Sequence, residues 1–308
     1  MRQQPNVKYL IYPSLLDGFQ RYLDTTPENF MYQGEDGKWH MNYSESTDEY
    51  QYSSEQVEEM SKQQLIDKIN RVKFESDAAT RGTVFNELVD CFVNKKRSET
   101  VKMEGHRSTD SITTELNGKV FDFSFSFVEN YAGTLEGATN QLYVKAPIET
   151  DYGNVLLYGY IDEVKEDKVI DIKTTTRYQF GDFNDHWQRH VYPYCLIESG
   201  KMQDISSFVY SVVVLKGGTS RTPLISGNVF NEEYTYDHSQ SRSMLKSFLE
   251  RFIEFLNDNR DKITDKKIFN EHQQCIVEVL RKPLLDKDSG ELNFLRYGYK
   301  RQNVSRVS

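Results

Sequence analysis

Two β-type runs of apolar residues stand next to each other in the middle of the chain. Residues 155–164 and 169–175 are rich in Val, Ile, Leu, Tyr and Thr, and only the charged tetrapeptide Lys-Glu-Asp-Lys at 165–168 separates them. β-Branched and aromatic residues favour strands, and a short polar break between two such runs is typical of a hairpin. The pattern therefore predicts a β-hairpin over residues 155–175.

The register of this hairpin determines which side chains share a face. An even loop places Val164 opposite Val169, whereas an odd-length loop would break this pairing. Continued along the strands, the register pairs Asp162 with Asp171 and Tyr160 with Lys173. Because side chains alternate between faces, these four residues share one face, and we expect the other to be core; it carries Leu157, Ile161, Ile170 and Ile172.

Helical periodicity and β-type alternation predict the remaining elements. Helices are expected at 56–77, 78–94, 187–197 and 241–257, and strands at 120–127, 142–150, 205–215 and 229–236. Near the start, Ser14 is interpreted as the N-cap of an amphipathic helix that runs to Leu23. This order predicts an α/β (α+β) fold, with a mixed sheet flanked by helices and helical additions at both ends.

Three regions follow from this pattern. Residues 1–77 form an N-terminal helical region with an acidic polar insertion at 33–59, residues 78–260 form the core, and residues 261–308 form a C-terminal extension. With 308 residues and 37% hydrophobic content, the chain can bury a full core. Because there is neither a run of transmembrane length nor an apolar leader, we expect a cytoplasmic protein without a membrane partner.

The paired carboxylates bring in candidate chemistry. Asp162 and Asp171, directly opposite on a sheet, would repel each other unless a cation neutralised them. Mg²⁺ or Mn²⁺ prefers carboxylate and carbonyl oxygens, and the Ile172 carbonyl would be a further ligand. Such an ion activates water, and Lys173 on the same face can reach a scissile phosphate. Alone, an Asp-x-Lys tripeptide is more often a solvated ion pair.

A third element follows the hairpin. Gln188 and Tyr192 are four residues apart in the predicted helix at 187–197 and therefore project from one face. Taken alone, this spacing is also that of an ordinary amphipathic helix with Tyr192 in the core.

The three elements together have a characteristic order. Gly-x-x-Asp ending at Asp162, Asp-x-Lys from Asp171 to Lys173, and Gln-x-x-x-Tyr from Gln188 to Tyr192 resemble the PD-(D/E)xK nuclease superfamily. The last element is similar to its RecB-like branch, which includes phage-type exonucleases. The resemblance covers residues 80–200 by motif and implies a restriction-endonuclease-like αβββαβ core. It also implies that Asp162 and Asp171 bind metal, that Lys173 is catalytic, and that Gln188 and Tyr192 contact the nucleic-acid strand.

A fourth element lies upstream, in the run that begins Arg81-Gly82. It is similar to the Gly-x-x-x-His helix of the RecB-like branch, where the His is a metal ligand, but Asn86 stands at the His position here. Relatives in the wider superfamily use a Glu from this helix, and Glu87 is the neighbouring candidate. Both residues stay open as the third ligand, and Arg81 is a candidate phosphate contact.

The net charge of −9 argues against nucleic-acid binding at first sight, since phosphate contacts need Lys and Arg. Much of the acid lies between Glu35 and Glu59, however, and basic clusters occur elsewhere. These clusters are Lys95 to Arg97 and, near the C-terminus, Arg296, Lys300, Arg301 and Arg306. Three widely spaced cysteines, Cys91, Cys195 and Cys275, supply neither a disulfide framework nor the four thiolates of the iron–sulfur subgroup.

The resemblance leads to a specific expectation: a Mg²⁺-dependent DNA exonuclease of replication, recombination or repair, encoded by a bacterium or phage. Linear DNA ends are the expected substrate, and a single-strand annealing or recombination protein is a compatible partner, as is an oligomer. Two alternatives stay open within this fold, a sequence-specific endonuclease and a catalytically inactive DNA-binding or assembly subunit. A glycosidase also uses two carboxylates about 5 Å apart, but Lys173 and the presence of only two tryptophans disfavour it.

Overall fold

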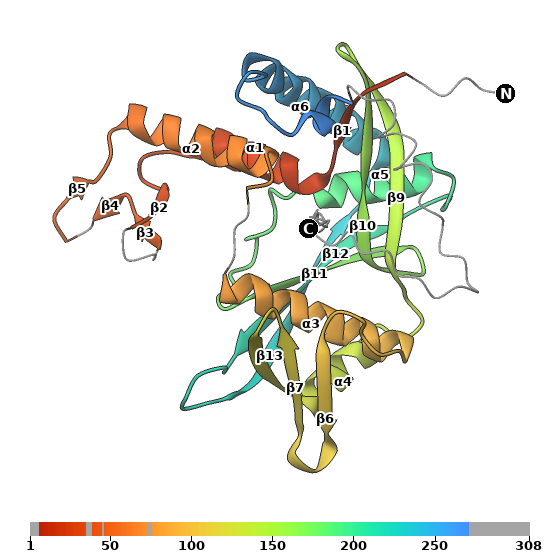
Figure 1. The fold of residues 1–308 in the computed structure, drawn as a ribbon. Coiled ribbons are helices and arrows are strands. Elements are labelled where there is room, and N and C mark those ends of the chain that lie inside the picture. Colours follow the sequence, from red (N-terminus) through yellow and green to blue (C-terminus); the bar gives the residue numbers. More distant parts are fainter. Residues whose placement is uncertain (1–5, 35–38, 45, 73–75, 271–308) are drawn as a thin grey trace, which may run out of the picture.

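A nine-stranded mixed sheet organises the computed structural model, which describes residues 6–34, 39–44, 46–72 and 76–270. Along its main path the strand order is β1, β10, β11, β12, β13, β8, β7, β6, and β9 pairs with β10. The bounds are β1 Val7–Ile11, β6 Lys102–His106, β7 Ser111–Leu116, β8 Lys119–Ser124, β9 Thr139–Thr150, β10 Gly153–Lys165, β11 Lys168–Thr175, β12 Ser207–Lys216 and β13 Leu224–Thr235. Mixed α/β architecture is thereby confirmed (Figure 1).

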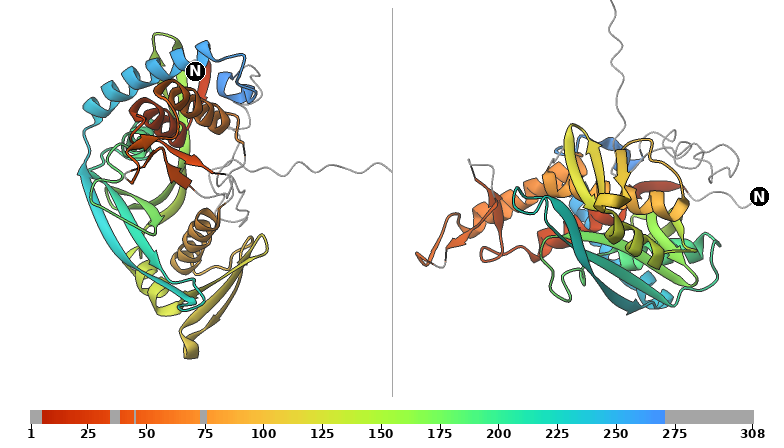
Figure 2. Two further views of the ribbon diagram at one scale, coloured as in Figure 1. Left: turned by 90° about the vertical axis from the view of Figure 1, so that its left-hand side faces the viewer. Right: turned by 90° about the horizontal axis from the view of Figure 1, so that it is seen from below.

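Six helices accompany this sheet within the described residues. They are α1 Pro13–Asp24, α2 Ser54–Ile69, α3 Asp77–Asn94, α4 Phe125–Thr134, α5 Gln188–Glu198 and α6 His238–Asp258. Figure 1 shows α1, α5 and α6 with β1, β9 and β10 in one part of the molecule, and α3 and α4 with β6, β7 and β8 in the other. β11 and β12 connect the two parts, and the view in Figure 2 shows their curved course.

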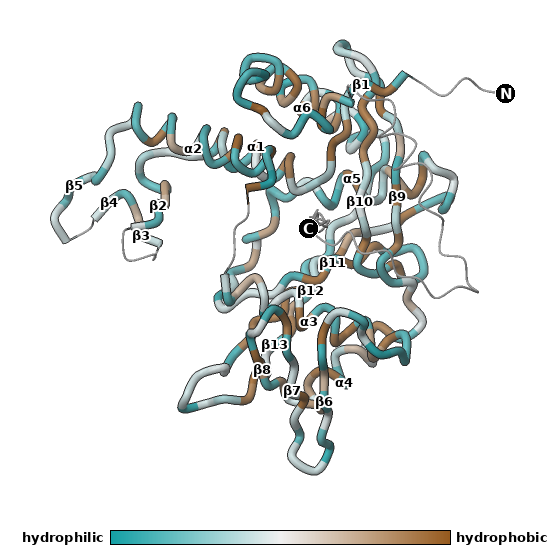
Figure 3. The backbone as a smooth tube through the Cα atoms, viewed as in Figure 1, coloured by the Kyte–Doolittle hydropathy of each residue, from teal (hydrophilic) through white to brown (hydrophobic). Residues whose placement is uncertain are grey.

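Each part has its own apolar core. The larger cluster joins β1, β9, β10 and β12 to α1, α5 and α6, and includes Leu157, Val191 and Phe252. The smaller one joins α3 and α4 to the other face of β11 and β12, and includes Phe85 and Ile172. Figure 3 shows the hydrophobic stretches concentrated on the sheet strands and the helices beside them. None of the described helices has the length and apolar character needed to span a membrane.

The predicted hairpin is present, but its ladder is shorter than expected. Val164 pairs with Val169, as predicted, and Glu163 pairs with Ile170, where the pairing of β10 with β11 ends. The expected pairing of Asp162 with Asp171 and of Tyr160 with Lys173 is wrong: the ladder stops at Glu163 and Ile170, and further along β10 it is β1 that pairs, from Asn154 to Leu157.

The predicted division into a polar and an apolar face is also wrong at this point. Leu157 and Ile161 belong to the larger core, whereas Ile170 and Ile172 pack in or against the smaller one. Two opposite faces are buried because helices cover both sides of the sheet, so alternation cannot assign one of them to solvent.

The other predicted elements agree in type, with informative exceptions. The strand expected at 120–127 ends at Ser124, whose hydroxyl accepts a hydrogen bond from the Phe127 N–H and begins α4. α1 starts at Pro13 with Tyr12 as its N-cap, so Ser14 is not the cap. Proline is favoured at the first helical position because its missing N–H would have no helical partner there.

Several strands have no counterpart in the prediction. β1 pairs in parallel with β10, so the N-terminal region contributes to the same sheet as the predicted core. β6 and β7 form a further hairpin beside β8. The short strands β2 (Met31–Gln33), β3 (Trp39–Met41), β4 (Tyr43–Ser44) and β5 (Glu49–Tyr50) project from the body beyond α2 (Figure 1). The C-terminal basic cluster at 296–306 and Cys275 lie outside the described residues.

Candidate functional site

β10 has an interruption on one of its two edges. β9 pairs along one edge, while the other edge pairs first with β1, up to Leu157, and then with β11, from Glu163 onward. Among the residues that the structure describes, no strand pairs with residues 158–162 on that edge; we call this segment the open edge. Asp162 lies at its end, and its Oδ2 accepts a 2.9 Å hydrogen bond from the backbone N–H of Ile172. The carboxylate thus bridges the point where β10 and β11 separate.

Asp171, Lys173 and Gln188 form a connected polar cluster beside this bridge. The Lys173 ammonium lies 2.7 Å from Asp171 Oδ2. Gln188, at the start of α5, donates from Nε2 to Asp171 Oδ1 at 2.8 Å and accepts a hydrogen bond from Lys173 through Oε1. Lys173 also lies over the Tyr210 ring. The structure therefore brings together a carboxylate, an ammonium and an amide from two of the three motifs.

Electrostatics make Asp171 a poor site for an uncompensated negative charge. Its side chain is 2% exposed, and burial raises the pKa of the carboxyl far above its usual range. Lys173 lowers that pKa, whereas the negative charges of Asp162 and Asp17 raise it further. A bound cation would offset the negative charge that burial and the neighbouring Asp162 make unfavourable at Asp171.

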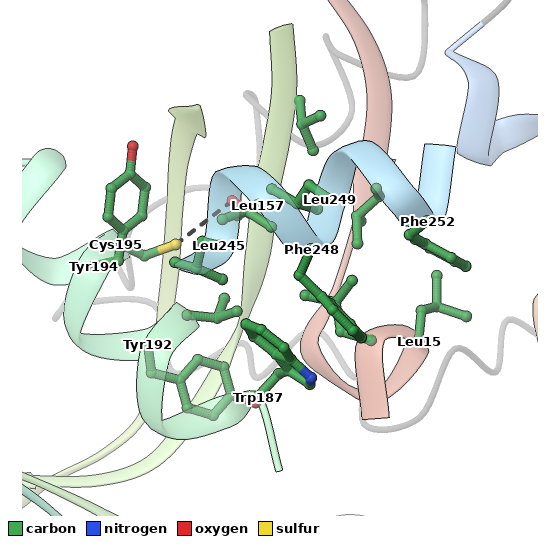
Figure 4. Close-up of a cluster of buried hydrophobic side chains, with 14 of the residues drawn as sticks. Leu15, Leu157, Trp187, Tyr192, Tyr194, Cys195, Leu245, Phe248, Leu249 and Phe252 are labelled. Atoms are coloured by element: carbon green, nitrogen blue, oxygen red, sulfur yellow. Dashed lines mark hydrogen bonds between the residues drawn. The ribbon is translucent and has the colours of Figure 1, made fainter. Parts of the chain in front are cut away.

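The Gly-x-x-Asp and Gln-x-x-x-Tyr motifs are in direct contact. A Cβ at Gly159 would lie 2.8 Å from Tyr192 Cε1, so the missing side chain makes room for the tyrosine ring. Tyr192 is 7% exposed and packs in the larger core, as the alternative interpretation of its helical spacing expects (Figure 4). That Tyr192 contacts a nucleic-acid strand stays a prediction. The burial of the ring argues against it.

The two candidate ligands on α3, Asn86 and Glu87, have different surroundings. Gly82 packs against β11, where a Cβ would meet Thr174 Oγ1 at 2.4 Å, and Asn86 is one helical turn further on. Asn86 Oδ1 is buried and has no hydrogen-bond partner among the described residues. Glu87 Oε1, by contrast, accepts a 2.8 Å hydrogen bond from Ser98. The orphaned oxygen makes Asn86 the stronger candidate for a ligand from this helix.

The structure shows where Ile172 and Arg81 lie, and their roles stay predictions. Ile172 uses its N–H for Asp162, and its carbonyl stays a predicted metal ligand. Arg81 begins the same helix face as Phe85 and lies near Gly218, in the connection between β12 and β13. No group of three or more His, Cys, Asp or Glu side chains in the described parts of the chain is arranged to hold a metal ion.

Two residues near the cluster were missed in the sequence. Asp17 of α1 accepts a 2.6 Å hydrogen bond from the backbone N–H of Trp187, at the N-terminus of α5, and lies 3.9 Å from His186. Burial lowers the pKa of His186, although Asp17 acts to raise it. The signal was the Asp17-Gly18 pair inside an amphipathic helix, since both residue types are unfavourable there without a specific role.

The donor set fits a hard divalent cation. Mg²⁺ is usually held by one or two carboxylates with waters and substrate phosphates. Asp162 and Asp171 would supply the two carboxylates, and the buried Asn86 oxygen on α3 would be a further neutral donor. These are the residues that would hold the ion.

Comparison with known proteins adds little to this geometry. No protein-family model and no curated protein sequence matches the chain. Among solved structures, the crystal structure of SSO0001 matches with a TM-score of 0.27 and 12% identity, over 39% of this chain and 55% of that chain. A likeness at this level carries no argument about fold family or function.

Proposed function

We propose that the protein is a divalent-metal-dependent nuclease that hydrolyses phosphodiester bonds in DNA, with exonuclease activity favoured. The observation that carries this proposal is the cluster of the buried Asp171 with the partly buried Lys173 and Gln188, beside the Asp162 bridge. The element order is compatible with an αβββαβ core, in which a helix precedes β9, β10 and β11, and α5 and β12 follow.

Each residue of the cluster has a role that its contacts support. Asp162 and Asp171 would hold Mg²⁺ or Mn²⁺, which when bound activates water and stabilises negative charge on phosphate. Lys173, oriented by Asp171 and Gln188, places a positive charge where charge develops on the phosphoryl oxygens. Gln188 forms hydrogen bonds with both Asp171 and Lys173 and thereby fixes the position of the lysine side chain.

The proposal is tested with end-labelled DNA. Linear and circular substrates, single- and double-stranded, are incubated with Mg²⁺, Mn²⁺ or EDTA. Asp171→Asn and Lys173→Ala should each reduce the rate by about 10²–10⁴-fold. Lys168→Ala, at the other end of β11 and paired with the exposed Glu233, is the matched control and should retain activity.

The outcomes separate the alternatives. Metal-dependent loss of linear DNA alone identifies an exonuclease, and cutting of circles identifies an endonuclease. Tight DNA binding without cleavage under any metal would contradict the proposal and favour the inactive subunit. The metal concentration required by Asn86→Ala and by Glu87→Gln decides which α3 residue completes the site.

A further inference from the structure

Lys68 is a lysine that the catalytic proposal does not use, although it lies close to the site. It belongs to the last turn of α2, which packs beside α1 (Figure 1). Its aliphatic stem crosses Gly18, where a Cβ would lie 2.9 Å from Lys68 Cδ and 3.3 Å from Nζ. The glycine therefore lets the half-buried lysine lie flat against α1.

The charges around Lys68 are mostly positive. Its ammonium is within electrostatic range of the positive charges of Arg21 and Lys173 and of the negative charge of Asp17, which offsets them. Burial lowers the pKa of Lys68 to about 8; Asp17 acts against this shift, whereas Arg21 and Lys173 add to it. Lys68 therefore lies among two other cations and one acid, and one of these cations is Lys173 of the proposed catalytic cluster.

That acid is already engaged elsewhere. Asp17 accepts the hydrogen bond from the Trp187 N–H and lies near His186. Within the described ranges, Lys68 Nζ forms neither an ion pair nor a hydrogen bond. A half-buried ammonium without a close partner is unfavourable in the free protein and gains most when an anion arrives.

We propose that Lys68 binds a phosphate group of the substrate strand, in a subsite next to the one served by Lys173. This inference rests on the proposed nuclease function. The phosphate is either an internal diester or the monoester at a strand end, because both present the same charged oxygens. Arg21 is within electrostatic range of Lys68 and would add positive charge to the subsite.

The test measures DNA binding without cleavage. Fluorescence anisotropy in Ca²⁺ or EDTA follows a labelled single-stranded oligonucleotide, with a 5′-phosphate or a 5′-hydroxyl, over a series of salt concentrations. Lys68→Met keeps the apolar stem and removes the charge, and Lys68→Arg keeps the charge. Lys62→Met is the matched control, six residues earlier and so on a different face of α2.

Lys68→Met should weaken binding about 10-fold at low salt and reduce the slope of log K against log salt by about 0.7, the value for one phosphate contact to a single strand. Lys68→Arg should restore most of the affinity, and Lys62→Met should match the wild type. A loss confined to the 5′-phosphorylated strand identifies the terminal monoester, whereas an equal loss with both identifies the internal diester.

Failure of this inference is distinguishable from failure of the nuclease proposal. If the wild type binds and cleaves DNA while Lys68→Met has wild-type affinity and salt slope, Lys68 is only a packing residue. If the wild type neither binds nor cleaves DNA, both are overturned. The melting temperature of each variant confirms that it is folded.

Discussion

Asp171 is the residue with the strongest argument for a function, and its burial as a carboxylate lowers the stability of the folded protein. It is almost fully buried, it faces Lys173, and it lies near the negative charges of Asp162 and Asp17. Gln188 and Lys173 compensate part of its charge when it is ionised. A residue that is unfavourable in the free protein yet placed beside a second carboxylate is typical of a functional site.

This arrangement predicts a pH dependence of stability. The pKa of Asp171 is raised to about 7 in the folded protein, so the native state holds a proton that the unfolded chain releases near pH 4. The resulting stability is present below pH 4 and is lost as the pH rises through 7. In EDTA, Asp171→Asn should therefore be more stable than the wild type by about 1–3 kcal/mol at pH 8 and gain little at pH 4.

Thermal melting at both pH values checks this prediction. Asp167→Asn, at the exposed turn after β10, is the control and should show no such pH-dependent difference. Added Mg²⁺ should raise the melting temperature of the wild type more at pH 8 than at pH 5, because metal binding requires the ionised carboxylate. Equal wild-type and Asp171→Asn stabilities at pH 8 would show that Asp171 is not destabilised by burial.

At the scale of elements, the contact between α5 and β10 determines where the motifs lie. Tyr192 of α5 occupies the space that Gly159 leaves on β10, three residues before Asp162. Tyr192 belongs to the larger core, and Trp187, the N-cap of α5, stacks on Phe248 of α6 (Figure 4). This packing holds the start of α5, and with it Gln188, against the open edge.

Gly159→Ala should disturb this contact. The added methyl would lie 2.8 Å from the Tyr192 ring, so we expect a loss of about 1–3 kcal/mol in unfolding free energy and a fall in activity as Gln188 shifts. Tyr192→Leu in the Gly159→Ala background should recover part of the loss. Gly133→Ala in α4, where a Cβ meets nothing within 4 Å, is the control and should be neutral or stabilising.

Chemical denaturation of the single and double variants measures the coupling. Additive effects of Gly159→Ala and Tyr192→Leu would contradict the proposed contact.

At the scale of the whole molecule, the negative charge is concentrated in one region. Residues 28–59 contain nine acidic residues and one lysine, a net charge of −8 out of −9 for the chain. They include the projecting strands β2 to β5, which lie away from β10, β11 and α5, the elements that carry the polar cluster, in Figure 1. The remainder of the protein is close to neutral, so an overall acidic charge does not oppose DNA binding at the site.

This distribution predicts faster DNA association when the projection is neutralised. Glu28→Gln, Asp48→Asn and Glu49→Gln together should raise the association rate about 2–5-fold at ~20 mM salt and have no effect at ~0.5 M, where charges are screened within a few ångströms. The amides can still accept the hydrogen bonds from Tyr50 and Tyr43. Stopped-flow fluorescence measures the rates; a gain that persists at high salt would indicate a local contact instead.

Much of the site was readable from the chain because its signals are local. Alternation and a short charged loop predicted the hairpin and the Val164–Val169 pair, and helical spacing predicted α5. The residue types of Asp162, Asp171, Lys173 and Gln188 indicated metal and phosphate chemistry, since such groups are expensive to bury without a function. The cluster of Asp171, Lys173 and Gln188 comes from only two elements that follow each other in the chain, β11 and α5.

The tertiary structure alone decided what distant segments bring together. The pairing of β10 with β11 stops at Glu163, and β1 rather than β11 pairs with the far end of β10, so Asp162 forms a bridge to the Ile172 N–H instead of a cross-strand pair with Asp171. Asp17 and Lys68 come near the site through the packing of α1 and α2, and the Tyr192 ring fits where Gly159 lacks a side chain. Sequence patterns report the period of one element at a time, whereas these contacts depend on how separate elements pack.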